Sequence, residues 1–211
     1  MRILPMLMIA GLLAQTPPPG VQVKIDISEA RGLRDWDLDG NGAWTVRGKT
    51  LVLEKAGVPG GPIRRPAAIA VYRKEAPASF VFEVDVRSTA PVDLPVRDVL
   101  LIFGYQSPTQ FYYVHLAAKT DPVHNGIFLV NNADRRRLDD PTASPRLTDQ
   151  AWHRIRLERR VESGSIRVFF GEDRTPLLSA RDGTLAAGRV GVGSFDETAQ
   201  FRAFDVRQLG R

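Results

Sequence analysis

The sequence predicts an all-β protein in which two antiparallel sheets pack face to face. No window of about 11 residues shows the i, i+3, i+4, i+7 apolar spacing of an amphipathic helix, whereas strand-like alternation runs along the whole chain. The 18 glycines and 15 prolines divide the chain into short segments. Because these segments follow one another too closely for crossover helices, parallel βαβ units are disfavoured and an antiparallel sandwich remains.

The expected strands either alternate between apolar and polar residues or are apolar throughout. In segment 80–88, Phe80 and Phe82 begin an apolar face, and Glu83 and Asp85 lie on the opposite face. Segment 99–106 is apolar on both faces, as in a central buried strand. Segments 111–118 and 125–132 flank a turn-rich link and predict a hairpin. The expected strands are 21–27, two within 43–55, 67–74, 80–88, 99–106, 111–118, 125–132, 152–160, 165–172, 189–195 and 201–208.

Residues 1–14 have the pattern of a secretory signal peptide. Arg2 precedes an apolar run that ends at Ala14, and this run is shorter than the roughly 20 residues needed to cross a bilayer. The alternative is an apolar N-terminal strand of the mature fold. We expect cleavage after Ala14, an exposed leader and first strand over 15–29, and one folded domain over 30–211. The expected location is outside the cytoplasm, periplasmic or secreted, with no membrane span after signal removal.

The charge and cysteine content exclude several classes of site. The net charge is +5, and 24 of the 29 basic residues are arginines. These arginines alternate with apolar residues and lie among acidic residues, so a solvated surface is favoured over a nucleic-acid-binding one, and no nucleic-acid partner is expected. The absence of cysteine excludes disulfides, thiolate metal sites and a cysteine nucleophile. Nothing in the composition indicates an oligomeric state.

Several segments, taken in order, resemble a known group of folds. They are WTVRGKTLVL, YQSPTQFYYVHL, WHRIRLERR, SIRVFFGEDRTPLLSARD, GRVGVGSF and FRAFDVRQL. Their order resembles that of the concanavalin A-like, laminin-G-like jelly rolls of exported bacterial proteins, and it is most similar to that of the 3-keto-disaccharide hydrolase-like domains. The resemblance covers roughly residues 30–210. It implies a jelly-roll sandwich of the lectin and glucanase type that recognises or processes carbohydrate.

The strand FYYVHL (111–116) provides the candidate sugar contacts. Alternation places Tyr112 towards the core and Phe111, Tyr113 and His115 on the opposite side. The resemblance implies that sugars lie on that open side, where aromatic rings stack on pyranose rings and polar groups bond the hydroxyls. The residues expected to bind the substrate are Tyr105, Gln106, Phe111, Tyr113, Asn125, Asn131, Asn132 and Arg135.

His115 and His124 are the candidate catalytic bases. The predicted hairpin brings them near each other without pairing them. In a 3-keto-glycoside, the C3 ketone acidifies the C2 proton, so a histidine base at either position would start elimination of the glycosidic group. Two alternatives stay open. The histidines are structural, or they hold zinc, although nothing nearby in the sequence compels the third ligand that such a site needs.

The segment DLDGNG (37–42) begins like a calcium loop. Asp37, Asp39 and Asn41 have the spacing of the first ligands, but Gly48 stands where an EF-hand needs its glutamate. A looser structural calcium site remains, with Asp205 as the late ligand that the resemblance implies. The alternative is a turn stabilised by the Asp and Asn side chains. Apart from this calcium, no cofactor is required.

The strand EVDVRS (83–88) is similar to the E-x-D-x-x-E strand of laminarinase-type glycosidases. Glu83 and Asp85 share one face, but Ser88 occupies the position of the general acid. The alternative is a charged strand face exposed to solvent.

The favoured function is an exported carbohydrate-binding or carbohydrate-processing domain that acts on 3-keto-glycosides through a histidine base. Whether the chain is an enzyme stays open. The alternatives are a non-catalytic laminin-G-like module that binds a protein or a surface polymer, and a calcium-stabilised adhesive domain.

Overall fold

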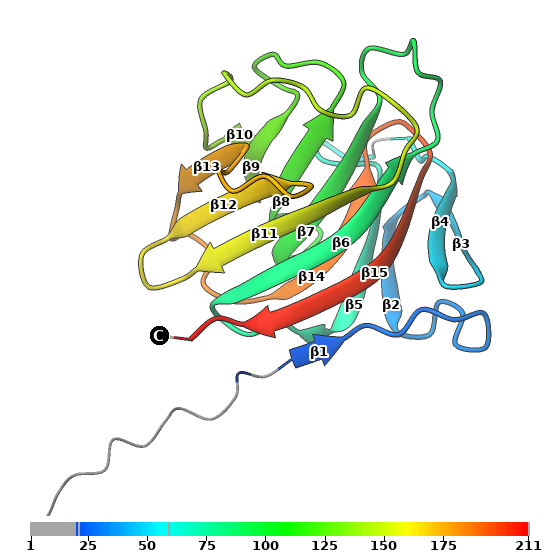
Figure 1. Cartoon of the computed structure of the whole chain (residues 1–211), viewed down its shortest axis with the longest axis horizontal. Coiled ribbons are helices and arrows are strands. Elements are labelled where there is room, and N and C mark those ends of the chain that lie inside the picture. Colours follow the sequence, from blue (N-terminus) through cyan, green and yellow to red (C-terminus); the bar gives the residue numbers. More distant parts are fainter. Residues whose placement is uncertain (1–19, 21, 59, 211) are drawn as a thin grey trace, which may run out of the picture.

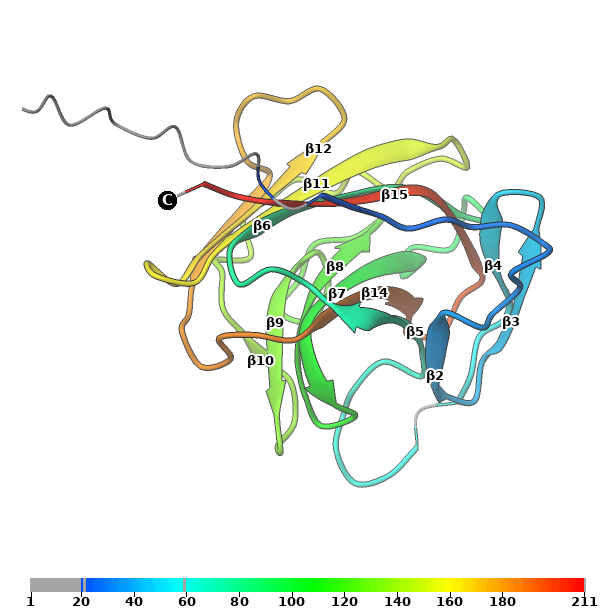
Figure 2. The same cartoon turned by 90° about the horizontal axis from the view of Figure 1, so that it is seen from below.

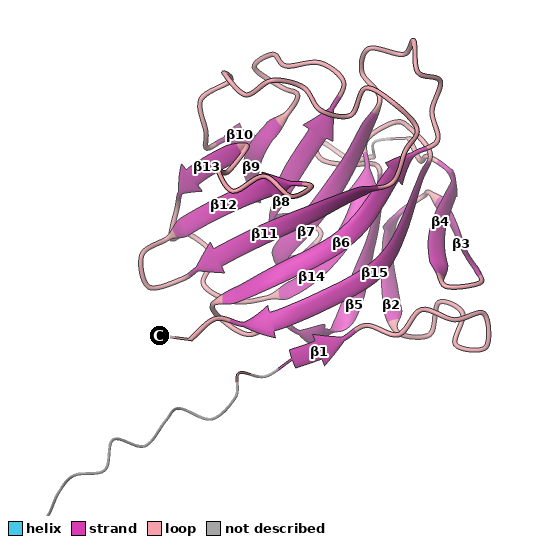
Figure 3. Cartoon of the chain, in the orientation of Figure 1, coloured by secondary structure: helices cyan, strands magenta, loops and turns pink. Residues whose placement is uncertain are grey.

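The computed structural model describes residues 20, 22–58 and 60–210, which form two antiparallel sheets without any helix (Figure 1; Figure 3). One sheet has seven strands, in the spatial order β10 (Arg136–Arg137), β9 (Gly126–Asn131), β8 (Gln110–Ala117), β7 (Asp98–Ser107), β14 (Arg189–Ser194), β5 (Ala68–Glu75) and β2 (Trp36–Gly40). The other has eight, in the order β13 (Leu178–Arg181), β12 (Ser165–Phe170), β11 (His153–Arg160), β6 (Phe80–Ser88), β15 (Ala199–Gln208), β4 (Thr50–Lys55) and β3 (Ala43–Arg47), with β1 (Gln22–Lys24) paired to β15.

This architecture confirms the predicted two-sheet antiparallel sandwich. Every expected segment contains a strand, and β6 has the predicted bounds. The predicted hairpin is β8–β9, in which His115 pairs with Gly126. β7 lies between β8 and β14 and is buried on both faces, as predicted for a central strand. Three short strands, β2, β10 and β13, were not expected. The alternating segment of β2 was interpreted as the start of a calcium loop or a turn, and β10 and β13 are too short to show a pattern.

The main core lies between the two sheets (Figure 2). Apolar residues at every second position of β6, among them Phe82 and Val84, meet those of β8, among them Tyr112 and Val114, and all four are fully buried. Apolar burial on this scale is the dominant stabilising term of such a sandwich.

The glycines of the segment GRVGVG let neighbouring strands of the seven-stranded sheet approach closely, as the sequence indicates. Val190 and Val192 face the core, so Gly191 and Gly193 face outward. A Cβ at Gly191 would lie 2.4 Å from the carbonyl oxygen of Ala70 on β5. No side chain fits there without displacing backbone.

The N-terminal predictions fall partly outside the described residues. The predicted signal peptide over 1–14 is one of them. Within the predicted leader and first strand over 15–29, the first strand is Gln22–Lys24, and Ile25 and Ile27 are buried in the core. The folded body therefore begins before residue 30. The described part of the chain contains no helix long and apolar enough to cross a membrane.

Candidate functional site

The outer face of the seven-stranded sheet, which points away from the main core, carries most of the predicted site residues. Alternation along β8 turns Phe111, Tyr113 and His115 to this face, as predicted. However, Phe111 and Tyr113 have no exposed surface and His115 is 1% exposed. The prediction that they line an open side is therefore wrong, because other chain segments cover them.

The cover comes from the segment that leads into β5 and from the link between β9 and β10. Figure 2 shows the first of these (cyan) on the side of the seven-stranded sheet that faces away from the other sheet. Ile63 packs on the outer-face aromatic cluster. The Arg64 backbone nitrogen donates to Asp134 Oδ1 at 2.7 Å, and the Arg135 nitrogen donates to the Arg64 carbonyl at 3.3 Å. The two segments thereby close over the face together.

Arg135, in the link between β9 and β10, also covers the outer face. The Cζ atom of Arg135 lies 4.5 Å from the ring centre of Phe195 and 5.5 Å from that of Phe128. Its Nη1 donates weakly to the Tyr113 hydroxyl at 3.4 Å. Burial raises the pKa of that hydroxyl, against the influence of Arg135. Of the predicted contacts, Arg135 is thus half-buried over the rings of Phe128 and Phe195, and Tyr113 is fully buried.

The two candidate bases lie close together but in different surroundings. The ring centres of His115 and His124 are 5.3 Å apart. His115 Nε2 lies 2.9 Å from Asp98 Oδ2, and its Nδ1 lies 3.2 Å from the Val123 carbonyl. Both partners are acceptors, so the ring bonds to both only when both nitrogens carry protons. A buried ring with both nitrogens engaged has no free position from which to remove a substrate proton.

His124 is more accessible. Its side chain is 21% exposed, and its Nδ1 lies 2.8 Å from Asp121 Oδ1. Burial opposes the charge on Asp121, but hydrogen bonds from His124, Val123 and Lys119 outweigh it and hold the pKa of this carboxyl below its usual range. Asp121 therefore orients His124 through Nδ1.

The sequence did not reveal the buried acidic residues beneath His115. Asp98, at the start of β7, accepts a hydrogen bond from Ser194 Oγ at 2.5 Å. Glu197 is 8% exposed, and its Oε2 has no hydrogen-bond partner among the described residues. Burial, together with repulsion from Asp98 and Asp196, raises the pKa of Glu197 to about 8. Asp98 and Ser194 are the first and last residues of β7 and β14, and only the sheet order brings these two strands side by side.

The predicted asparagine contacts separate into one structural residue and two exposed ones. Asn125 is fully buried, and its amide donates to Thr120 Oγ1 at 2.9 Å and to the Ala143 carbonyl at 3.1 Å. It holds a loop in place, so its predicted role in substrate binding is wrong for this structure. Asn131 and Asn132 are exposed at the far end of β9, as expected for a rim.

An open groove lies where β5 and β7 end and β14 begins. It has a volume of about 490 Å³, and the residues that line it include Arg73, Glu75, Tyr105, Gln106 and Arg189. Two of the predicted substrate-binding residues, Tyr105 and Gln106, therefore meet here. The basic and acidic members were not predicted, because only the sheet order brings the ends of these three strands together.

A β-bulge turns Tyr105 to the outer face of the sheet, where it lies buried beside this groove. The register between β7 and β14 shifts next to Gly104, whose φ is 57°. Without the bulge, Tyr105 would share the core-facing side of Phe103. With it, the Tyr105 hydroxyl donates to Asp39 Oδ2 at 3.1 Å. Burial and the Asp39 carboxylate raise the pKa of Tyr105.

Arg189 forms the wall of the groove. Its Cζ lies 5.2 Å from the ring centre of Tyr105, and its Nη1 lies 2.5 Å from Asp37 Oδ2. Arg73 bonds the other oxygen of Asp37 at 2.9 Å. The hydrogen bond from Arg189 outweighs burial and, with the charge of Arg73, lowers the pKa of Asp37. Gln106 is exposed, and its amide donates to the Ala187 carbonyl at 2.9 Å.

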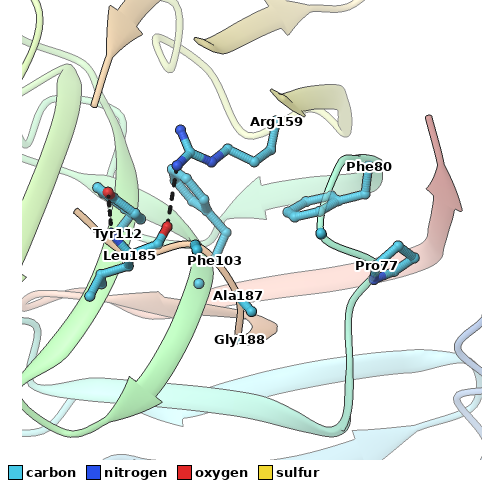
Figure 4. A pocket seen from close by; sticks show the side chains of 11 residues that line it. Pro77, Phe80, Phe103, Tyr112, Arg159, Leu185, Ala187 and Gly188 are labelled. Carbon is cyan, nitrogen blue, oxygen red and sulfur yellow. Dashed lines mark hydrogen bonds between the residues drawn. The ribbon is translucent and has the colours of Figure 1, made fainter. Parts of the chain in front are cut away.

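A second, enclosed cavity lies between the sheets and is too small to be a sugar site. It holds about 10 Å³, and the core side chains Phe80, Phe103 and Tyr112 line it (Figure 4). The buried Arg159 donates at its edge to the Leu185 carbonyl at 3.2 Å. This cavity belongs to the core packing.

Comparison with known proteins finds likeness in solved structures alone. No family model matches the chain, and no curated protein matches it. The carbohydrate binding module CBM66 from Bacillus subtilis is 16% identical, with a TM-score of 0.62 over 82% of this chain and 96% of that one. Winged bean acidic lectin, complexed with methyl-α-D-galactose, is 13% identical, with a TM-score of 0.61 over 91% and 100%. The chain has a concanavalin A-like jelly-roll fold.

A further structure with this jelly-roll fold is the Ca²⁺-bound exoplasmic/lumenal domain of VIP36. It is 13% identical, with a TM-score of 0.59 over 88% of this chain and 90% of that one. At these identities the likeness concerns the fold.

The predicted calcium ligands do not fit a metal site in this jelly roll. The Asp37 carboxylate forms ion pairs with Arg73 and Arg189. The two carboxylate oxygens of Asp39 accept hydrogen bonds from the Arg65 guanidinium at 2.7 and 2.8 Å. Asn41 Oδ1 accepts from the Val58 nitrogen, and Asp205 lies on β15 in the other sheet. No group of three or more His, Asp or Glu residues in the described ranges is arranged to hold a metal. Asp37 and Asp39, the two acids of β2, instead form ion pairs with arginines. The four predicted calcium ligands therefore do not come together as one site.

The laminarinase-like pair lies on the outer face of the eight-stranded sheet. Glu83 is paired with Arg154 and Arg207, and Asp85 with Arg154 and Arg202. This supports the alternative of a charged strand face exposed to solvent.

Proposed function

We propose that this jelly roll binds carbohydrate in the groove beside Tyr105. The groove supports this because it offers a carboxylate, an amide and guanidinium groups within one open volume of about 490 Å³. Each sugar hydroxyl both donates and accepts hydrogen bonds, so a mixed lining of this kind suits it. The similar structures include a carbohydrate binding module and a lectin complexed with methyl-α-D-galactose, and they support the same class of ligand.

A glycan array with two groove variants tests this proposal. Glu75→Gln and Gln106→Ala remove one charge and one amide without touching the core, since both side chains are exposed. Gln150→Ala is the matched control, because the exposed Gln150 amide likewise donates to a backbone carbonyl, that of Ala90 at 2.8 Å. We expect the wild type to bind a set of glycans, the groove variants to bind them about tenfold or more weakly, and the control to match the wild type.

Two results would contradict the proposal. One is equal binding by the groove variants and the wild type, which would place the glycan elsewhere. The other is an array on which no glycan binds. That result would favour the alternative of a laminin-G-like module that binds a protein or a surface polymer.

A second candidate function is the elimination reaction on 3-keto-glycosides, with His124 as the base. The observation that favours it is the Asp121–His124 contact of 2.8 Å through Nδ1, which leaves Nε2 to accept a proton. His115 is unsuited because both of its ring nitrogens are engaged. His124→Ala should abolish product formation from a 3-keto-disaccharide. His153→Ala, which removes another Asp-paired histidine, should not. No product from the wild type would exclude this function.

Export is the remaining part of the proposal. It is supported by the signal-like pattern of residues 1–14. Expression in a bacterium with an intact export pathway should give a mature chain that begins at Gln15 by N-terminal sequencing. A chain that keeps residues 1–14 and stays in the cytoplasm would contradict it.

A further inference from the structure

Two arginines on the cover of the outer face have no carboxylate partner. Ten arginines in the described part of the chain place Cζ within 6 Å of an aromatic ring centre. Six of them also form an ion pair with an Asp or Glu. A seventh, the buried Arg159, donates to three backbone carbonyls. Of the remaining three, Arg87 lies over Trp152, whereas Arg64 and Arg135 contact the same ring, that of Phe195, and neither of these two pairs with a described carboxylate.

The geometry brings these two guanidinium groups together. Their Cζ atoms lie 5.5 and 4.5 Å from the Phe195 ring centre, so they are separated by at most about 10 Å. Their backbones are joined by the 3.3 Å hydrogen bond from the Arg135 nitrogen to the Arg64 carbonyl. Salt screens the repulsion between two exposed charges at such a separation, whereas an anion placed between them would be attracted to both. Asp134, the nearest acid in the chain, is instead bonded to the Arg64 backbone nitrogen.

The side chains are also accessible. Arg64 is exposed and Arg135 is half-buried, whereas the Phe195 ring beneath them is 3% exposed. A guanidinium that stacks on a ring through its face keeps its N–H groups free at its edge. Those N–H groups form a planar fork that matches a carboxylate or a sulfate. The buried aromatic cluster below excludes water from one side and strengthens such a bond.

We infer that Arg64 and Arg135 bind an oxyanion carried by a sugar, the carboxylate of a uronic acid or a sulfate ester. The sugar part rests on the proposed function, whereas the oxyanion part does not. The ligand class is therefore an acidic glycan, with its charge held above Phe195. Arg65, the neighbour of Arg64, bonds Asp39, which also accepts the Tyr105 hydroxyl, so the cover segment connects this site with the groove.

The test is NMR titration of the full chain with glucuronate, glucose 6-sulfate, glucose and inorganic sulfate. We expect the acidic sugars to bind about tenfold or more tightly than glucose and to shift the side-chain Nε–H signals of Arg64 and Arg135. Raising NaCl from about 0.01 M to about 1 M shortens the screening length from about 30 Å to about 3 Å, and it should remove this preference.

Three variants complete the design. Arg64→Gln and Arg135→Gln should each weaken acidic-sugar binding about tenfold while leaving glucose binding unchanged. Arg64 is exposed, so its variant is expected to fold even if the loss of Arg135 loosens the cover. Arg156→Gln is the matched control and should retain the preference. It removes an arginine whose Cζ lies 3.6 Å from the Phe169 ring centre, but Arg156 already pairs with Glu158.

The outcomes separate this inference from the proposed function. The oxyanion site is overturned if the wild type binds glucose and glucuronate with equal affinity. It is also overturned if Arg64→Gln and Arg135→Gln both keep the wild-type preference for acidic sugars. Neither result contradicts glycan binding in the groove. Binding of inorganic sulfate at these two arginines, without binding of any sugar, supports the oxyanion site and contradicts carbohydrate binding.

Discussion

Replacing Glu197 with glutamine should remove a large pH dependence of stability. Glu197 is buried next to Asp98 and Asp196, and its pKa is raised from an ordinary 4.5 to about 8. Between these two pH values the folded chain keeps a proton at Glu197 that the unfolded chain has lost. Folding is linked to proton binding in this window, so the free energy of unfolding falls as pH rises from about 4.5 to about 8.

The size of the effect follows from the shift. Each pH unit within the window lowers the free energy of unfolding by about 1.4 kcal/mol, so the loss between pH 5 and pH 8 is about 4 kcal/mol. Glutamine is neutral at every pH and has nearly the same shape as glutamate. The free energy of unfolding of Glu197→Gln therefore lacks this pH-dependent contribution. The variant and the wild type should have similar stability near pH 5, and the variant should be the more stable at pH 8.

Urea unfolding at pH 5, 6.5 and 8 measures the difference between the two chains. Titrating groups remote from Glu197 contribute equally to both chains and cancel in that difference. The control is Glu172→Gln, since Glu172 is exposed on a turn. It should follow the wild type at each pH. Parallel stability curves for the wild type and Glu197→Gln, with no divergence from pH 5 to pH 8, would refute the reasoning about the buried acid.

Two further predictions concern packing and calcium. Gly191→Ala should destabilise the fold by about 2–3 kcal/mol in urea unfolding, because its Cβ would lie 2.4 Å from the Ala70 carbonyl oxygen. Gly183→Ala, with nothing within 4 Å of its Cβ, should have almost no effect, and equal losses in both would contradict the packing account. EDTA should leave the melting midpoint unchanged, because the acids of the predicted calcium site are bonded to arginines. A fall of several degrees that added calcium reverses would show that calcium stabilises the fold.

Periodicity carried most of the fold prediction, and it also gave the direction of the side chains on β8. The two-residue repeat correctly turned Tyr113 away from the main core, because successive side chains of a strand point to opposite faces. It could not indicate that the segments carrying Arg64 and Arg135 cover this face. Cover by loops depends on contacts between segments about 70 residues apart, such as that of Arg64 with Asp134, and these leave no periodic pattern.

The candidate site was predicted only in part, for a related reason. Tyr105 was expected to contact the ligand, but it lies on the outer face beside the groove only because the bulge next to Gly104 reverses its direction. Asp37 and Asp39 have a spacing that suits a calcium loop and a strand face equally well. Arg73 and Arg189 decide between the two, and they lie 36 and 152 residues from Asp37 along the chain.

The claim that carbohydrate occupies the groove can be tested most directly by mapping backbone amide shifts while the best array glycan is added. The account predicts that the largest changes fall on Tyr105, Gln106 and Gly188, at the adjoining ends of β7 and β14. Changes concentrated on the eight-stranded sheet, around Glu83 and Arg154, would contradict it.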